Sequence, residues 1–103
     1  MKYDIILSEE AHSDVDSVLH YIVNVLKNPT AAKNLLDKIE KVYTDIANNP
    51  FMYAYCNNSR LQNDEYRKVV INHYVLIYRV DEAKNTVFVV RLFYGRQNYI
   101  ALI

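Results

Sequence analysis

The chain has 103 residues, an apolar share of 51% and a charged share of 23%, which are the proportions of one ordinary globular domain covering 1–103. No apolar run approaches the ~20 residues that a membrane-spanning helix needs, and the N-terminus lacks the apolar stretch of a signal peptide. We therefore expect a cytoplasmic protein without membrane contact. The only cysteine, Cys56, excludes an internal disulfide, and a single glycine excludes a Gly-rich phosphate loop.

The formal net charge is zero, which argues against general affinity for nucleic acid, but the charges are unevenly distributed. Residues 1–65 carry six Lys/Arg and ten Asp/Glu, whereas residues 66–103 carry six Lys/Arg and two Asp/Glu. Two interpretations follow from this acidic N-terminal part and basic C-terminal part. Either the halves attract each other within the fold, or the basic part meets an acidic partner.

The N-terminal half predicts one strand and two helices. Tyr3–Leu7 is a short apolar run, and Ser8 before Glu9 and Glu10 is typical of a helix start. Apolar residues then recur at helical spacing until Asn28-Pro29-Thr30, where Thr30 is the expected cap of a second helix. Its apolar positions are Ala32, Leu35, Ile39, Val42 and Ile46, and it ends at Asn48-Asn49-Pro50. Two such helices joined by a tight turn form an antiparallel hairpin.

The C-terminal part predicts a loop over 51–65 and then three strands. The runs 66–72, 73–80 and 86–94 are rich in β-branched and aromatic residues and are separated by a tight turn at Asn72-His73 and a longer one at Asp81–Asn85. The apolar tail 98–103 is expected to form a final turn or to add to the sheet edge. The order β-α-α-β-β-β indicates an α+β fold with a helical hairpin on a mainly antiparallel four-stranded sheet.

The sequence predicts no metal or cofactor site. The histidines His12, His20 and His73 lack ligand spacing, and Cys56 has no second cysteine and no neighbouring base in the sequence that would activate it. What stands out is a set of cations and tyrosines in the strands. Cleaving RNA without a metal needs a base, a cation at the phosphate and an acid, and these residues include such groups. The alternative is that they are paired within the fold or lie at an interface.

The motifs YRK at 66–68, YRV at 78–80, VVRL at 89–92 and GRQNY at 95–99, together with the element order, resemble the RelE/ParE superfamily of type II toxins. The resemblance implies a toxin that arrests bacterial growth, serves in plasmid stabilization, and is neutralised by a cognate antitoxin. RelE-like members cut mRNA on the ribosome, whereas ParE-like members inhibit DNA gyrase and are not known to be nucleases.

The details favour the ParE side. RelE-like sequences have an arginine directly after the aromatic residue that opens the middle strand, whereas here Val75 follows Tyr74. The ParE-like ending R-x-x-H-x-R is similar to Arg91–Arg96, with Tyr94 in place of the histidine. The resemblance implies three sets of site residues. These are target contacts at Arg91, Arg96 and Tyr99; antitoxin contacts at Arg67, Arg79 and Arg91; and, if the protein is RelE-like, a catalytic set of Lys68, Arg79, Tyr94 and Arg96.

Overall fold

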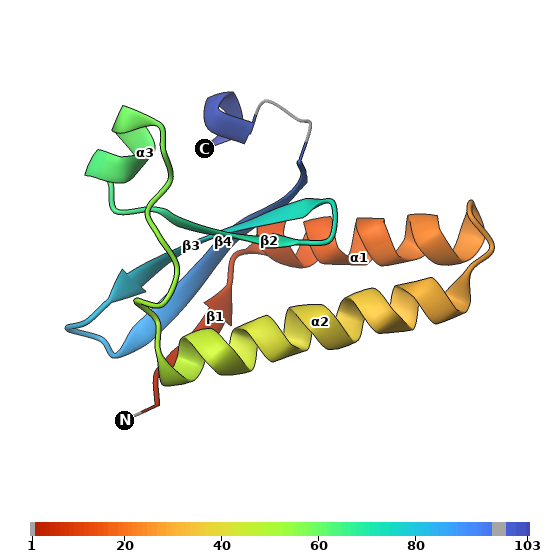
Figure 1. The fold of residues 1–103 in the computed structure, drawn as a ribbon, viewed down its shortest axis with the longest axis horizontal. Coiled ribbons are helices and arrows are strands. Elements are labelled where there is room, and N and C mark those ends of the chain that lie inside the picture. The colour runs from red at the N-terminus through yellow and green to blue at the C-terminus, as the bar shows by residue number, and fades with distance from the viewer. Residues whose placement is uncertain (1, 96–98) are drawn as a thin grey trace.

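A mixed four-stranded sheet carries a helical hairpin on one side and short segments on the other. The computed structural model describes residues 2–95 and 99–103. Its elements are β1 (Asp4–Leu7), α1 (Glu9–Asn24), α2 (Pro29–Asn48), α3 (Ser59–Asn63), β2 (Arg67–Ile71), β3 (Tyr74–Asp81), β4 (Thr86–Tyr94) and the 3-10 turn η1 (Tyr99–Leu102). Figure 1 shows α1 and α2 side by side along the sheet, and the predicted α+β fold is confirmed.

The helix starts follow from capping side chains. The Ser8 hydroxyl accepts a hydrogen bond from the Ala11 N–H, as the sequence predicts, and Glu9 and Glu10 occupy the first turn of α1. The second cap differs from the prediction: Asn28, rather than Thr30, accepts from the Ala31 N–H, and Pro29 is the first residue of α2. Proline suits that position because its missing N–H has no partner there in any helix.

The sheet order is β1-β4-β3-β2, so the first strand lies beside the last. β1 is parallel to β4, and the other pairs are antiparallel. The turn at Asn72 is tight and has a left-handed backbone (φ 55°), which asparagine tolerates. The lone glycine, Gly95, follows β4 at a close approach, because a Cβ there would lie 3.0 Å from the His73 carbonyl oxygen.

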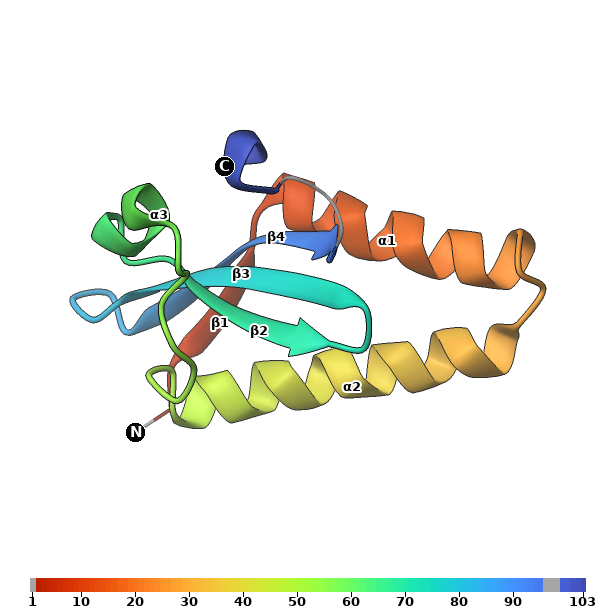
Figure 2. The same cartoon turned by 45° about the horizontal axis from the view of Figure 1, so that its top comes forward.

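Both faces of the sheet are packed, but unequally. The face under α1 and α2, here called the helix face, holds the larger core, which includes Ile39, Leu76, Tyr78 and Val89. The opposite side, here called the second face, is only partly covered, by α3 and the C-terminal turn (Figure 2). Its buried cluster is Cys56, Leu61, Val75, Ile77 and Phe93.

A β-bulge in β4 decides which side chains reach each face. Ile77 lies opposite Arg91, but the next residue of β3, Tyr78, lies opposite Val89, so β4 contains one extra residue. Such an insertion reverses the alternation of every later side chain in the strand. Arg91 and Phe93 therefore share the second face with Ile77, and Tyr94 shares the helix face with its partner Tyr74.

The segment between α2 and β2 is more ordered than the sequence predicts. The expected loop contains the short helix α3, which Asn58 caps through its side chain. Residues 54–56 also pair with the start of β2: the Cys56 N–H donates to the Tyr66 carbonyl, and the Lys68 N–H donates to the Ala54 carbonyl. Five residues are too few to show a helical period, so α3 left no pattern in the sequence.

Candidate functional site

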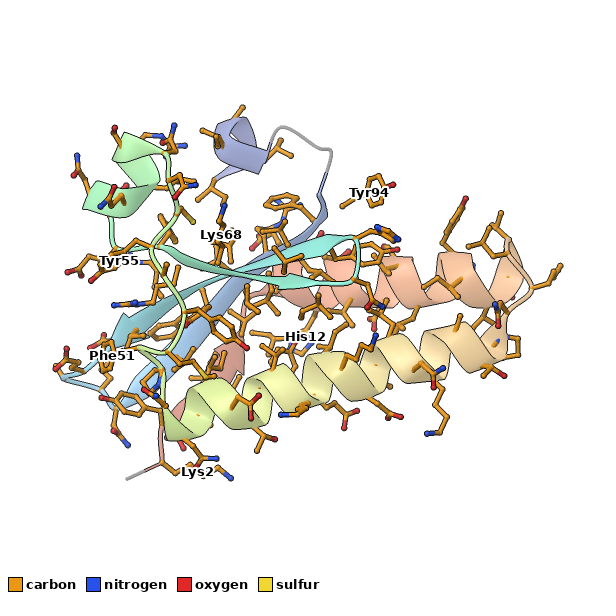
Figure 3. The ribbon with its side chains drawn as sticks, in the orientation of Figure 1. Lys2, His12, Phe51, Tyr55, Lys68 and Tyr94 are labelled. Atoms are coloured by element: carbon orange, nitrogen blue, oxygen red, sulfur yellow. The ribbon has the colours of Figure 1, made fainter. Side chains whose placement is uncertain are left out.

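Arg67 is held by the chain segment that precedes α3. Its Nη1 donates to the Tyr53 carbonyl at 2.6 Å, and its guanidinium carbon lies 4.1 Å from the Tyr55 ring centroid and 5.3 Å from that of Phe51. Figure 3 labels both aromatic residues beside the sheet. A guanidinium placed against two rings gains cation–π energy and excludes water. Arg67 therefore fixes this segment onto the sheet.

Arg91 is paired with α1. Its Nε lies 2.7 Å from one Asp14 oxygen and its Nη2 lies 3.1 Å from the other, while the Leu92 N–H also donates to Asp14 at 2.9 Å. This bidentate pair raises the pKa of Arg91 and keeps the guanidinium charged. Arg91 also lies over the Phe93 ring at 4.5 Å. Attraction between the acidic and basic halves of the chain is thus realised at this contact.

Arg79 lies on the second face in a hollow of about 500 Å³. Its guanidinium carbon is 5.1 Å from the Tyr66 ring, and the side chain is exposed. The hollow is also lined by three acids, Glu65, Asp81 and Glu82, and by Val80, Phe88 and Val90. This cation therefore lies among carboxylates and not in a basic patch.

Lys68 shares the second face with Arg79. It lies opposite Ile77 on β3, two residues from Arg79, so the two side chains leave the sheet about 7 Å apart along the strand. Lys68 is also close enough to Cys56 for its positive charge to lower the pKa of that thiol. The sequence alone does not reveal this neighbouring cation. Burial has the larger effect, so the pKa of Cys56 is raised and the thiol is not activated.

Tyr94 is on the other face. Its ring packs edge-on against Tyr74, with centroids 5.9 Å apart, at the end of the sheet nearest α1. Burial, followed by the neighbouring phenols of Tyr94 and Tyr21, raises the pKa of Tyr74. Arg79 is five residues from Tyr74 along β3, or about 17 Å. Figure 3 shows Tyr94 and Lys68 well apart. The fold therefore does not bring Tyr94 together with Lys68 and Arg79.

The outer edge of β2 is open next to α2. Because the Lys68 N–H points outward to Ala54, the alternation of the ladder directs the Val70 N–H and C=O outward as well. The Val70 side chain is 65% exposed. A groove of about 440 Å³ between this edge and α2 is lined by Lys38, Lys41, Val42, Asp45, Tyr53, Val69, Val70, Ile71 and Asn72.

The remaining predicted contact residues, Arg96 and Tyr99, follow β4 in the sequence. Arg96 lies outside the described residues, and of Tyr99 only the backbone is described, as the first residue of η1. Over 2–95 and 99–103, no group of three or more His, Cys, Asp or Glu side chains is arranged to hold a metal ion. In the same ranges, no helix combines the length and apolar character that crossing a membrane demands.

The sequence matches a family model over residues 5–99, and that model describes the ParE toxin of the type II toxin-antitoxin system parDE. The chain belongs to this family. It is therefore a type II toxin of the RelE/ParE superfamily, as its motifs suggested. No curated protein matches the sequence significantly.

Solved structures support the same fold at low sequence identity. A chain of the chromosomal ParDE toxin-antitoxin system from P. aeruginosa aligns with a TM-score of 0.67 at 14% identity, covering 90% of this chain and 96% of that one. The E. coli toxin RelE in the free state gives 0.67 at 16%, covering 99% and 93%. The RelBE2 complex from Mycobacterium tuberculosis gives 0.64 at 16%, covering 91% and 99%. At such identities the likeness concerns the fold alone, and it includes both branches of the superfamily.

Proposed function

We propose that this ParE-family chain arrests growth by inhibiting DNA gyrase, without cutting RNA, and that a cognate antitoxin neutralises it. The family match supports the gyrase-directed branch. The bulge in β4 carries the proposal, because it turns Tyr94 to the helix face while Lys68 and Arg79 remain on the second face. General acid–base catalysis needs its groups within hydrogen-bond reach of one reacting centre, and these three do not meet that condition. Action on gyrase would take place in the cytoplasm.

A ribosome-dependent mRNA endonuclease of RelE type is the second candidate. The observation in its favour is that Lys68 and Arg79 are neighbours on one open face, where both could contact a phosphate backbone. The fold similarity to RelE is as high as that to the chain of the ParDE system. In that case the acid would have to be a group other than Tyr94.

Two assays on the purified toxin separate these functions: supercoiling by DNA gyrase, and cleavage of mRNA on programmed ribosomes. We expect inhibited supercoiling, intact mRNA, and unchanged inhibition by Tyr94→Phe. Cuts positioned by codon, with normal supercoiling, would refute the gyrase proposal and support the RelE-type candidate. Loss of those cuts in Tyr94→Phe would further show that our reasoning from the bulge is wrong.

We assign the target contact to Arg96 and Tyr99 and not to Arg91. Arg91 is already bound to Asp14, so its substitution would damage the fold before it could report on a target. Arg96→Ala and Tyr99→Ala should therefore weaken gyrase inhibition while leaving the thermal unfolding midpoint unchanged. Lys84→Ala, which removes an exposed cation in the β3–β4 turn, is the matched control and should inhibit normally.

For the antitoxin, we propose an extended segment that pairs with the open edge of β2 and lies in the groove beside α2. Several structural neighbours are toxin-antitoxin complexes. An edge strand with outward N–H and C=O groups can accept a further strand. Lys38, which no described carboxylate pairs with, borders the groove beside the Lys41–Asp45 pair, so an acidic residue in the segment would complement it. We expect that segment to be disordered alone.

This placement replaces the predicted antitoxin contacts at Arg67, Arg79 and Arg91. Arg67 is enclosed by aromatic rings, Arg91 is paired with Asp14, and Arg79 has three carboxylates around it. None of the three is therefore well disposed to attract an acidic peptide. Arg79→Glu should change antitoxin affinity by less than about twofold.

Val70→Pro tests the edge directly. Proline is tolerated at an edge position whose N–H faces outward, but it removes that donor. We expect weaker antitoxin binding by at least about tenfold, with an unchanged circular dichroism spectrum, because a ladder hydrogen bond is lost and the ring obstructs pairing. Val70→Thr keeps the N–H and is the control. Equal affinity for the proline variant would exclude strand addition at β2.

A further inference from the structure

The second face contains an apolar surface that no part of the described chain covers. Arg79, Phe88 and Ile6 lie in one row across β3, β4 and β1, since paired residues point to the same side of a sheet. Ile6 is 49% exposed, and Phe88 and Val90 are partly exposed. α3 and the C-terminal turn pack on the neighbouring half of this face, against Val75, Ile77 and Phe93 (Figure 2). The uncovered half, here called the shelf, is thus a surface whose exposed or partly exposed side chains Ile6, Phe88 and Val90 are apolar.

The rim of this shelf is acidic. Glu65, Asp81 and Glu82 line the hollow, and among the described residues Arg79 is the one cation that lines it with them. Arg67 lines a smaller hollow that also borders Glu65 and Glu82. The Arg79 guanidinium lies against the Tyr66 ring, and this contact holds it beside the apolar side chains of the shelf. Further along β4, Glu9 and Glu10 of α1 lie beside Arg91, whose charge Asp14 already balances. In the described part of the chain, more carboxylates than cations therefore border this surface, although the sequence predicts it to be basic.

We infer that this shelf is a docking surface for a basic amphipathic helix of a partner protein. The apolar stripe of such a helix would cover Ile6, Phe88 and Val90, and lysines or arginines beside the stripe would face Glu65 and Glu82. A helix fits better than a strand here, because β3 and β4 are inner strands and offer no free backbone edge beside the hollow. An acidic segment would meet like charges, which favours a basic one.

This surface is separate from the edge of β2, where we place the antitoxin strand. The shelf attracts positive charge, whereas the β2 edge attracts negative charge. A negative result for the peptide on the shelf therefore does not affect the proposed antitoxin strand at β2, and the reverse also holds. The inference also does not require that gyrase be the target. The inference gives the toxin a second kind of partner segment, a basic helix, besides the proposed antitoxin strand.

The test uses two synthetic helical peptides with the same apolar stripe, one with a Lys/Arg polar face and one with a Glu polar face. Binding of each labelled peptide to the full chain is measured by fluorescence anisotropy at low and at moderate salt. We expect the basic peptide to bind at least about tenfold more tightly than the acidic one, and its affinity to fall with salt. Equal binding of the two peptides, or no binding of the basic one, would overturn the inference.

Substitutions locate the binding on the shelf. The double variant Glu65→Gln and Glu82→Gln should weaken the basic peptide about three- to tenfold, from two exposed charge pairs. Arg79→Gln should tighten it, and Ile6→Asp should abolish it. Glu40→Gln, on the solvent side of α2, removes the same kind of charge elsewhere and should have no effect. If Glu40→Gln weakened binding as much as the double variant, the attraction would be general and the shelf would not be the site.

Discussion

Asp14 joins α1 to the last strand, and its removal should destabilise the whole domain. Its carboxylate accepts three hydrogen bonds, two from Arg91 and one from the Leu92 N–H. The Asp14 and Arg91 side chains are only 17% and 24% exposed. Asp14→Ala would leave a guanidinium and a backbone N–H in this poorly hydrated place without their acceptor.

The expected cost follows from the burial of the pair. Removing one partner of a fully buried ion pair costs about 3–5 kcal/mol, whereas exposed pairs contribute about 1 kcal/mol or less. A pair of intermediate burial with an additional backbone hydrogen bond should cost about 2–3 kcal/mol. For a domain of this size, that corresponds to a fall in the unfolding midpoint of about 10–20 °C.

The measurement is urea unfolding followed by circular dichroism, with Asp16→Ala as the matched control. Asp16 lies on the same helix and is exposed, so its substitution should change the free energy of unfolding by less than about 0.5 kcal/mol. A double-mutant cycle with Arg91→Met should give a coupling above about 1 kcal/mol. If Asp14→Ala and Asp16→Ala had the same effect, the pair would be merely a surface contact and our reasoning would be refuted.

Two tyrosines with buried hydroxyl groups give the remaining predictions. The Tyr78 hydroxyl donates to the Pro50 carbonyl at 2.8 Å, whereas the buried Tyr43 hydroxyl has no hydrogen-bond partner among the described residues. Tyr78→Phe should therefore cost about 1–2 kcal/mol in urea unfolding, and Tyr43→Phe should be neutral or stabilising by up to about 1 kcal/mol; the reverse order would contradict this hydrogen-bond assignment. Burial, the largest cause in both cases, raises the pKa of Tyr43 and of Tyr78 from 10.0 to about 12. Because the folded state holds these protons more tightly than the unfolded one, the free energy of unfolding should be constant below pH 10 and fall as the pH rises towards 12. Unfolding at pH 9 and pH 11 measures this fall, which should be smaller in Tyr78→Phe, and an equal fall in that variant would show that Tyr78 is not its source.

The elements of the fold were readable from the sequence because they follow local rules. Apolar residues at helical spacing, such as Leu35 and Ile39, are buried as predicted, and Ser8 caps its helix as predicted. The short helix α3 was missed because it is too brief to show a period. Thr30 was the wrong cap because two capping residues, Asn28 and Thr30, flank Pro29, and only the position of the proline decides between them.

The candidate site was less predictable, because it depends on register and on distant partners. The bulge at Val90 is one extra residue, yet it sends Arg91 to the second face and Tyr94 to the helix face. A strand pattern read without it places Tyr94 on the same face as Lys68. The partner of Arg91, Asp14, lies 77 residues away, so no local pattern could distinguish this paired arginine from the exposed Arg79.

The position of β1 has a consequence for how the molecule is made. Within the described part of the chain its only strand partner is β4, which lies about eighty residues further along the sequence. The Ser8 N–H and hydroxyl also bond to β4, at Val89 and Val90. The first strand and the cap of the first helix therefore cannot reach their native contacts until almost the entire chain has left the ribosome. With synthesis at about 5–20 residues per second, the N-terminal segment waits several seconds without its native partners. The sheet is therefore completed, and the mature toxin surface formed, only after the last strand has been synthesised.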